Sequence, residues 1–215
     1  AHIFEQRYGL KFAVVRNVAA KTALSEKPSI PLQKTLLYQG ALNEGRGLEA
    51  AIQAMQSIDN VQLAIAGEGD LSRQLRDRVQ QLHLENKVHF HGYVTPQELK
   101  LLTAQAWVGI NLLENRGLSY YYSLANKFFD CVQAGVPVIT MDFPEYRALN
   151  EAFEVAILLP ELTPEAVANA VNNLLNDKDL YNNLQQNCFK ARELWHWEAE
   201  EKVLLDFWGK VAAGA

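Results

Sequence analysis

The stretch VQLAIAGEGDLSRQLRDRVQQLHL, residues 61–84, joins a continuous apolar run to a glycine-rich turn and then to a segment with helical spacing. An apolar run of this length that stops at glycine is typical of a strand buried on both faces. Beyond the turn, apolar residues recur at Leu71, Leu75, Val79 and Leu82, which is the period of an amphipathic helix. This strand–turn–helix unit is the repeating element of parallel α/β sheets.

The same alternation runs through most of the chain. We therefore predict an α/β fold, a Rossmann-like doubly wound parallel sheet covered by helices on both faces, with ligands bound at the carboxyl ends of the strands. Strands are expected at 11–15, 35–38, 61–66, 87–90, 107–113, 136–139 and 155–159. Helices are expected at 48–55, 71–84, 96–105, 124–134, from 163 onwards, 180–194 and 199–211. Thr95 and Glu98, with Pro96 between them, form a capping box that predicts the start of the third of these helices.

With 215 residues, the chain has room for one α/β domain with a full core. Its opening residues, AHIF, look like a cut inside a longer protein. We predict the end of a preceding domain and a linker over 1–31, the α/β domain over 32–194, and a C-terminal helix over 195–215. Trp195, Trp197 and Trp208 are expected to pin the last helices to the body.

The net charge, the cysteine content and the lengths of the apolar runs each argue against a class of function. The net charge of -5 argues against nucleic acid as a partner. The two cysteines, Cys131 and Cys188, are too few for a disulfide framework, so buried free thiols in a reducing cytoplasm are expected. No uninterrupted apolar run approaches the ~20 residues of a membrane span.

The loop after the first domain strand, residues 40–47, holds three glycines and Arg46. Glycines let the backbone approach a ligand closely, and an arginine followed by a helix start suits phosphate. An ordinary strand-to-helix turn with a solvated arginine is the alternative.

The next loop, Gly67-Glu68-Gly69-Asp70, follows a buried strand as a dinucleotide fingerprint would. Ser72 stands where G-x-G-x-x-G needs its third glycine, so NAD binding is only weakly indicated. A tight turn in which Asp70 caps the following helix is the alternative.

The stretch after the fourth domain strand is the most informative about chemistry. Asn126, Lys127 and Asp130 lie on one expected helix, with Asn126 and Asp130 on the same face. A lysine at a helix start is unfavourable for the helix dipole, so an anionic ligand or a carboxylate is expected to compensate it. Asp130 can accept two hydrogen bonds from a ribose diol, although a polar surface face would show the same pattern. The tyrosines at 120–122 suit either stacking on a ligand or core packing.

Metal binding is not indicated. The histidines and cysteines lack metal-ligand spacing. Asp177-Lys178-Asp179 resembles a D-x-D metal motif but falls between two C-terminal helices, so it is expected to act as a helix cap.

Taken in order, these motifs resemble a family. GAL with Arg46-Gly47-Leu48, then AGEG, KVHFHGYV, SLANKFFD and AGVPVI are similar to the C-terminal domain of GT-B glycosyltransferases of the retaining family-four type. The resemblance covers roughly residues 32–194, and it is the joint order of the motifs that is specific.

The resemblance implies a role for each matching position. Donor phosphates would be bound by Gly40, Ala41, Arg46, Leu118, Ser119 and Lys127. The nucleotide and its ribose would be bound by Gly67, Gly69, Tyr93, Val94, Asn126 and Asp130. Glu114 is a candidate on the sugar side. Three positions depart from the family pattern: Ala41 replaces an arginine, Tyr122 stands at the first acid of E-x7-E, and Asp130 replaces the second glutamate.

The implied activity is transfer of a sugar, expected to be a hexose, from a nucleoside diphosphate sugar to an acceptor with retention, without a metal or other cofactor. The acceptor site and catalytic base are expected in the chain's own N-terminal domain, outside this sequence, so no catalytic residue is named here. The expected location is the cytoplasm, including the inner face of the membrane if that domain binds there. Two alternatives stay open: a nucleotide-binding or interaction module that has lost catalysis, and a Rossmann dehydrogenase.

Overall fold

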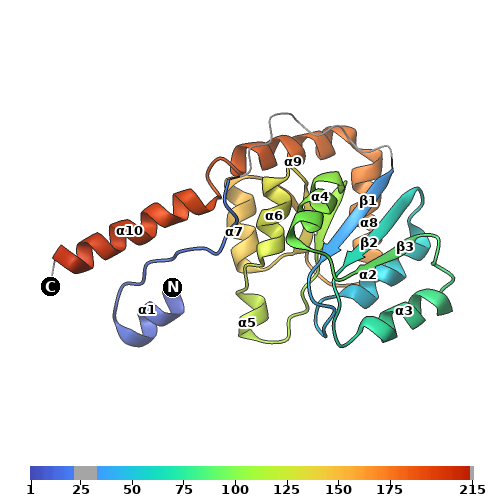
Figure 1. Ribbon diagram of the computed structural model, residues 1–215, viewed down its shortest axis with the longest axis horizontal. Helices are drawn as coiled ribbons and strands as arrows, with labels where there is room; N and C mark the ends of the chain where they lie inside the picture. Colours follow the sequence, from blue (N-terminus) through green and yellow to red (C-terminus); the bar gives the residue numbers. More distant parts are fainter. Residues whose placement is uncertain (22–32, 214–215) are drawn as a thin grey trace.

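The computed structural model of the protein describes residues 1–21 and 33–213. Six strands form one sheet in the order β3-β2-β1-β4-β5-β6 (Figure 1). Every pair of neighbours is parallel, so the predicted doubly wound sheet is confirmed. The strands are β1 (Lys34–Gln39), β2 (Val61–Ala66), β3 (Val88–Gly92), β4 (Val108–Asn111), β5 (Val138–Met141) and β6 (Ala156–Leu159).

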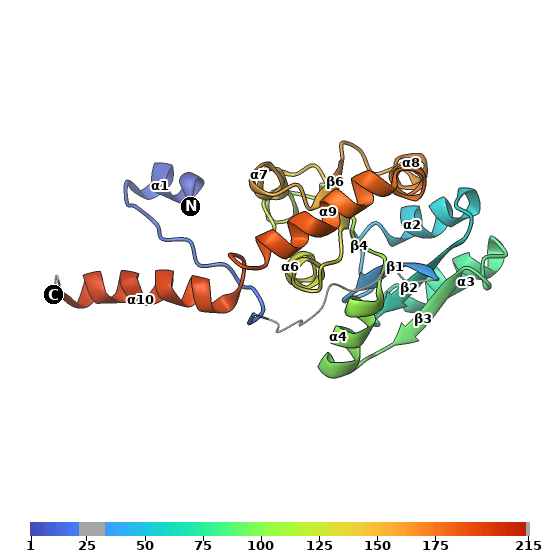
Figure 2. The same ribbon diagram turned by 90° about the horizontal axis from the view of Figure 1, so that it is seen from above.

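Helices cover the two faces of the sheet. Those that connect β1, β2 and β3 lie on one face, and α4 and α6 lie on the other (Figure 2). Strand order reverses between β1 and β4, and in such sheets ligands bind in the crevice at this reversal. The helices are α1 (His2–Tyr8), α2 (Leu48–Ala54), η1 (Met55–Ser57), α3 (Ser72–Gln81), α4 (Pro96–Gln105), α5 (Leu118–Tyr121), α6 (Asn126–Gln133), α7 (Pro144–Ala152), α8 (Pro164–Asn176), α9 (Lys178–Ala191) and α10 (Trp197–Ala213).

The core forms where the central strands meet these helices. Trp107, just before β4, stacks on Tyr181 of α9 with ring centroids 5.6 Å apart. The hydroxyl of Tyr181 donates to the Trp107 carbonyl at 3.1 Å, which satisfies a buried polar group. Cys131 and Cys188 are both buried free thiols, as predicted.

The predicted strand at 136–139 is observed two residues later, at Val138–Met141, for a reason found at the end of α6. Gly135 adopts φ 73°, and its N–H donates to the Val132 carbonyl. The next N–H, of Val136, donates to the Cys131 carbonyl at 2.9 Å. This is a Schellman cap. Because it consumes the Val136 N–H and Pro137 has none, neither residue donates to the sheet. The Pro137 carbonyl accepts from the Gly109 N–H of β4 at 2.9 Å, and the strand itself begins at Val138.

The predicted strand at 11–15 is wrong. These residues form no regular element, and the side chains of Phe12 and Val14 are 40% and 54% exposed. A strand needs a partner for its backbone groups, and the described part of the sheet offers none here. The short helices α1 and α5, and α7, were not predicted.

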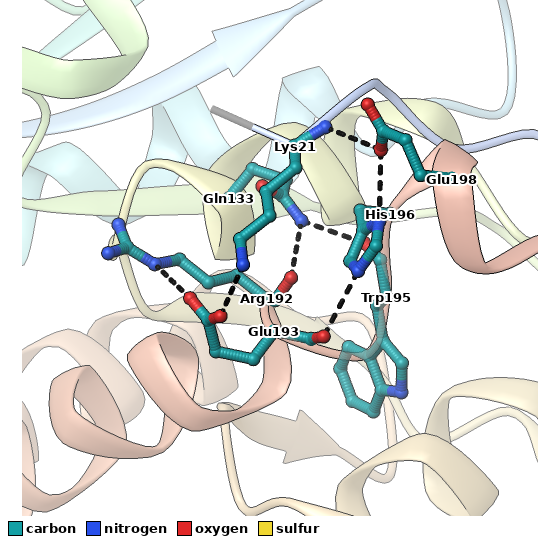
Figure 3. Close-up of polar contacts among 7 residues, drawn as sticks. All are labelled: Lys21, Gln133, Arg192, Glu193, Trp195, His196 and Glu198. Atoms are coloured by element: carbon teal, nitrogen blue, oxygen red, sulfur yellow. Dashed lines mark hydrogen bonds and ion pairs between the residues drawn. The ribbon is translucent and has the colours of Figure 1, made fainter. Parts of the chain in front are cut away.

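The N-terminal segment is attached to the start of α10. The Ala19 carbonyl accepts a hydrogen bond from the Trp197 N–H at 2.9 Å. The backbone N–H of Lys21 donates to Glu198, and the Lys21 ammonium pairs with Glu193 (Figure 3). Residues far apart in sequence are thus joined at one end of the domain. Most of the predicted linker, residues 22–32, lies outside the described residues.

The turn between α9 and α10 is held from α6. The amide of Gln133 donates to the carbonyls of Arg192 and Trp195 at 3.1 and 2.8 Å (Figure 3). Trp195 is 5% exposed and packs edge-on against Phe129 of α6, which confirms its predicted anchoring role. Trp208 is 59% exposed, so the same prediction for that residue is wrong, because the outer part of α10 projects away from the sheet (Figure 1). Within the described ranges, no helix combines the length and apolar character needed to cross a membrane.

Candidate functional site

The loops that follow β1 and β2 pack directly on each other. Gly40 donates its N–H to the Ala66 carbonyl at 2.9 Å, and Gly67 donates to the Gly92 carbonyl at 2.8 Å. Gly67 has φ 139°, and a Cβ there would collide with the Gly40 carbonyl oxygen. A Cβ on Gly69 would collide with Asn43 and the Leu42 backbone. The packing of these loops therefore requires both glycines.

Asp70 does not cap α3, which corrects one expectation. Leu71 occupies the N-cap position without a side-chain cap bond, and the Asp70 N–H donates to the Asn43 side chain at 3.3 Å. Ser72 instead accepts a hydrogen bond from the Gly69 N–H at 2.9 Å. The turn is closed by this serine, at the position where a dinucleotide fingerprint has glycine.

Lys127 lies in the first turn of α6 and reaches back over the end of β1. Its ammonium nitrogen lies 3.8 Å from the centroid of the Tyr38 ring and against Gly40. Burial, together with the positive charge of Arg46, lowers the pKa of Lys127 to about 7. The structure thus places a lysine in an environment that disfavours its charged form.

Arg46 supplies the second cation. Its guanidinium carbon lies 5.5 Å from the centroid of the Tyr120 ring, and its Nε is buried with no hydrogen-bond partner among the described residues. Buried donors are normally satisfied, so an unpaired Nε is a position that an acceptor would fill. We call Arg46 and Lys127 the cation pair.

The neighbouring carboxylates are held by another arginine. Arg116 pairs with Glu44 at 2.7 Å and with Glu114 at 3.3 Å. The Glu114 N–H also donates to the Gly45 carbonyl at 3.0 Å, which ties the two loops together. Within residues 1–21 and 33–213, neither member of the cation pair forms an ion pair with a carboxylate.

Asp130 lies one turn further along α6 and has different partners. Its Oδ2 accepts from the Gln39 amide at 2.9 Å, and the Gln39 oxygen accepts from the Thr103 hydroxyl at 2.8 Å. Burial raises the pKa of Asp130, partly offset by the Gln39 hydrogen bond and the charge of Lys100. The carboxylate lines a mostly apolar groove of about 390 Å³ between α4 and α6. It does not pair with Lys127.

The remaining predicted residues lie around these groups. Leu118 and Ser119 are exposed on the short helix α5, and Asn126 is exposed as the first residue of α6. Tyr93 is 84% exposed after β3, while Val94 packs against the core. None of these five side chains forms a hydrogen bond or ring contact with the cation pair in the described structure, so their predicted roles stay predictions.

Sequence reasoning missed the aromatic side chains of this site. Tyr38 is two residues before Gly40, where it is indistinguishable in sequence from a core residue of the strand. Tyr120 was predicted, together with its two neighbours, either to stack on a ligand or to pack in the core, and its contact with Arg46 was not predicted. Gln39 in β1 and Thr103 in α4 were missed as well, because polar residues inside strand and helix patterns carry no periodic signal. Arg116 was missed because its partner Glu44 lies on another loop.

A six-stranded parallel sheet of this order defines a Rossmann-like α/β domain, and Arg46 and Lys127 lie where the strand order reverses, the place at which such sheets bind ligands. The family described as "Glycosyl transferases group 1" matches residues 21–191. The chain therefore belongs to the group 1 glycosyl transferases, and its fold is that of a GT-B C-terminal domain. This membership removes the dehydrogenase alternative.

Individual relatives agree with the family. An uncharacterised glycosyltransferase of Methanocaldococcus jannaschii is 28% identical over 196 residues, covering 87% of this chain and 49% of the relative. The phosphatidyl-myo-inositol mannosyltransferase of Mycobacterium leprae is 26% identical over 201 residues, covering 88% of this chain and 51% of the relative. The chain thus spans about half the length of these relatives.

Solved structures show the same fold. Sucrose-phosphate synthase from Thermosynechococcus elongatus superposes with a TM-score of 0.78 at 21% identity, covering 100% of this chain and 57% of that one. HepE of Anabaena, solved in complex with UDP and glucose, superposes with a TM-score of 0.70 at 15% identity, covering 84% of this chain and 49% of that one. Both are similar in fold to this protein.

Proposed function

We propose that this chain is the donor-binding domain of a glycosyltransferase that moves a sugar, of hexose type, from a nucleoside diphosphate sugar to an acceptor with retention of configuration. The observation that carries the proposal is the cation pair. Arg46 and Lys127 lie at the carboxyl edge of the sheet without a carboxylate partner in the described structure, and the Nε of Arg46 is an unpaired buried donor. A diphosphate brings the negative charge and acceptors that this arrangement lacks.

The chemistry follows from where charge develops. When the bond between sugar and diphosphate breaks, negative charge grows on the leaving phosphate, and two cations fixed beside it stabilise that state. This is why we propose that the protein uses no metal and no other cofactor. Ala41, Leu118 and Ser119 are proposed to complete the phosphate contacts through their backbone N–H groups. Gly40 donates its own N–H to Ala66 and is proposed to border the phosphates without a side chain in the way.

The nucleoside is proposed to lie beside α6. Asp130, held by Gln39, is the acceptor for the ribose hydroxyls, with Asn126 on the same helix face. Gly67, Gly69, Tyr93 and Val94 are proposed to border the nucleotide. Glu114 is proposed on the sugar side, where Arg116 orients it.

The catalytic base and the acceptor site are proposed to belong to the protein's own N-terminal domain, because the described residues offer phosphate and ribose contacts only. We propose a cytoplasmic location from the two free thiols, extending to the inner membrane face if that domain binds there. Nucleic acid is not a proposed partner, given the net charge of -5.

The proposal is tested by a thermal-shift panel of UDP, GDP, ADP and their sugars, with NAD as a control. A ligand at 100 times its dissociation constant adds about 2.7 kcal/mol of stability. Stabilisation by one nucleoside diphosphate and its sugar, and none by NAD, is expected. The absence of a shift with every diphosphate at millimolar concentration would contradict the proposal.

A second function is a nucleotide-binding or interaction module of the same fold that has lost catalysis. Two positions favour it: Ala41 and Tyr122 carry no charge where the family has an arginine and an acid, and Tyr122 packs edge-on against Tyr121 at 5.1 Å. Donor binding without any sugar transfer by a protein that includes the N-terminal domain would select this function.

A further inference from the structure

We propose that Tyr38 and Tyr120 are positioning residues of the diphosphate site, each holding one member of the cation pair against its ring face. The inference rests on the proposed function, because it concerns the cations that the diphosphate would meet. It assigns a role to two side chains that do not themselves bind phosphate.

Tyr38 is a fixed platform for Lys127. Tyr38 is 1% exposed, so the packing around it holds the ring in place. Its hydroxyl also donates to the Ala41 carbonyl at 2.7 Å. Burial raises the pKa of Tyr38 to about 12, so the phenol is neutral at physiological pH. The attraction for the ammonium, 3.8 Å from the centroid, therefore comes from the ring face and not from a phenolate.

Tyr120 does the same for Arg46 from the opposite loop. The Arg46 guanidinium carbon lies 5.5 Å from its centroid. Gly45 has φ 78°, and a Cβ there would lie 3.1 Å from the Tyr120 ring and 2.9 Å from Arg116. Glycine at position 45 is thus what allows the ring to approach the loop that carries Arg46.

Two aromatic rings can hold these cations without neutralising their charge, which two carboxylates could not do. A carboxylate would neutralise each cation and would have to be displaced when the diphosphate binds. A ring face attracts a cation but leaves its N–H donors unpaired. The nearby acids Glu44 and Glu114 are both engaged by Arg116, which keeps them from this role. The site therefore leaves the donors of Arg46 and Lys127 without a carboxylate partner, available to an anion.

The test measures the affinity of UDP, GDP and inorganic pyrophosphate by calorimetry, with uridine and guanosine as controls. Tyr38→Leu removes the ring, and we expect diphosphate binding to weaken about three- to tenfold, the range of a partly desolvated cation–π contact. Nucleoside binding should not change. Tyr38→Phe keeps the ring and should bind like the unsubstituted protein.

A double-mutant cycle separates positioning from loss of structure. If Tyr38 acts through Lys127, then Tyr38→Leu should cause no further loss in a Lys127→Met background. A second cycle pairs Tyr120→Leu with Arg46→Met. Because Tyr120 is less buried than Tyr38, this cycle still tests the inference if Tyr38→Leu fails to fold. Leu36→Ala, a core change in the same strand, controls for reduced stability and should leave diphosphate affinity unchanged.

Each outcome bears on the inference. The inference would be overturned if Tyr38→Leu reduced diphosphate affinity equally with and without Lys127. It would also be overturned if Tyr38→Phe reduced that affinity as much as Tyr38→Leu. Either result would leave the proposed function intact. If the unsubstituted protein binds none of the three probes, the proposed function fails first and this inference fails with it.

Discussion

The ammonium of Lys127 lies 3.8 Å from the centroid of the Tyr38 ring, and no described carboxylate pairs with it. The groups that act on it are the Arg46 cation, the Cys131 thiol and the apolar surroundings of α6. Burial and Arg46 both favour its neutral form, and the net result is a pKa of about 7. Lys127 therefore titrates near neutral pH.

The first prediction concerns pH. We expect a nucleoside diphosphate sugar to bind the ammonium form of Lys127, so affinity should be highest below pH 7 and fall as pH rises through 7 toward 9, by up to about tenfold per pH unit. The diphosphate of such a sugar has no proton to lose in this range, so the change reports on the protein. Lys127→Arg should remove the dependence because arginine stays charged. Calorimetry from pH 6.5 to 9 measures it, with exposed Lys178→Met as the control.

The contribution of Lys127 to the free energy of unfolding should rise with pH, whereas donor affinity should fall. Above pH 7 the folded protein has released the Lys127 proton, while the unfolded chain keeps it up to its ordinary pKa of 10.5. The unfolded state then binds more protons, so Lys127 contributes a rise in unfolding free energy with pH between 7 and 10.5. Lys127→Met should raise the melting temperature at pH 7. A lower melting temperature for this variant would contradict the assigned environment.

The second prediction concerns phosphate. Arg46→Ala should weaken binding of a nucleoside diphosphate more than binding of the bare nucleoside, by the ~1.5–3 kcal/mol of a charged hydrogen bond. Arg73→Ala is the matched control, because its side chain is 95% exposed on α3. Equal weakening of nucleoside and diphosphate would show that Arg46 does not contact phosphate.

The third prediction concerns ribose. Asp130→Asn keeps the shape and still offers an oxygen to the Gln39 amide, so the fold should be retained. Affinity for the ribonucleotide should fall, while that for its 2′,3′-dideoxy analogue should be nearly unaffected. Parallel losses for the two ligands would assign Asp130 a structural role in the chain of hydrogen bonds through Gln39 to Thr103.

The sequence predicts what depends on local pattern. The capping box is confirmed: Thr95 accepts from the Glu98 N–H, and Glu98 accepts from the Thr95 N–H at 2.7 Å. Its signal lies within four residues. By contrast, the apolar run at 11–15 has strand composition, but whether it pairs depends on distant partners that composition does not report.

The site residues likewise divide into those that local sequence pattern predicts and those that only the three-dimensional contacts reveal. Arg46 and Lys127 were found because charge next to glycine or at a helix start is unusual in sequence. That the two lie close enough to lower the pKa of Lys127 follows only from the loop after β1 meeting the start of α6. The contact of Arg116 with Glu44, 72 residues away in the sequence, is likewise visible only in three dimensions.

The fourth prediction concerns the acidic pair at the α8–α9 junction. Asp177 accepts a hydrogen bond from the Leu180 N–H at 2.8 Å, which confirms the expected helix cap. Asp177→Ala should therefore lower the unfolding free energy by about 1 kcal/mol. Urea denaturation measures the loss, and Asp177→Ser should recover most of it. Donor affinity should stay unchanged, and a change in its metal dependence would instead favour the D-x-D interpretation.

The fifth prediction concerns the chain as a unit. The chain spans about half the length of relatives such as the Mycobacterium leprae mannosyltransferase. The cation pair and Asp130 are proposed to contact phosphate and ribose, whereas sugar transfer also requires an acceptor held within reaction distance of the donor. We therefore expect the 215-residue chain to bind donor nucleotide and to transfer no sugar. Binding should be weaker than in a longer protein, because one side of the donor would remain in contact with water.

The measurement compares turnover of a radiolabelled nucleoside diphosphate sugar by this chain and by a longer protein that includes the preceding domain. Product analysis must separate transfer to an acceptor from slow hydrolysis, because water can reach the donor in an open site. Transfer by the longer protein that is lost with Arg46→Ala, together with binding but no transfer by the short chain, is the expected pattern. Efficient transfer to a non-water acceptor by the short chain would show that the acceptor site and the base lie within these 215 residues. Glu114, which pairs with Arg116, would then be the candidate base.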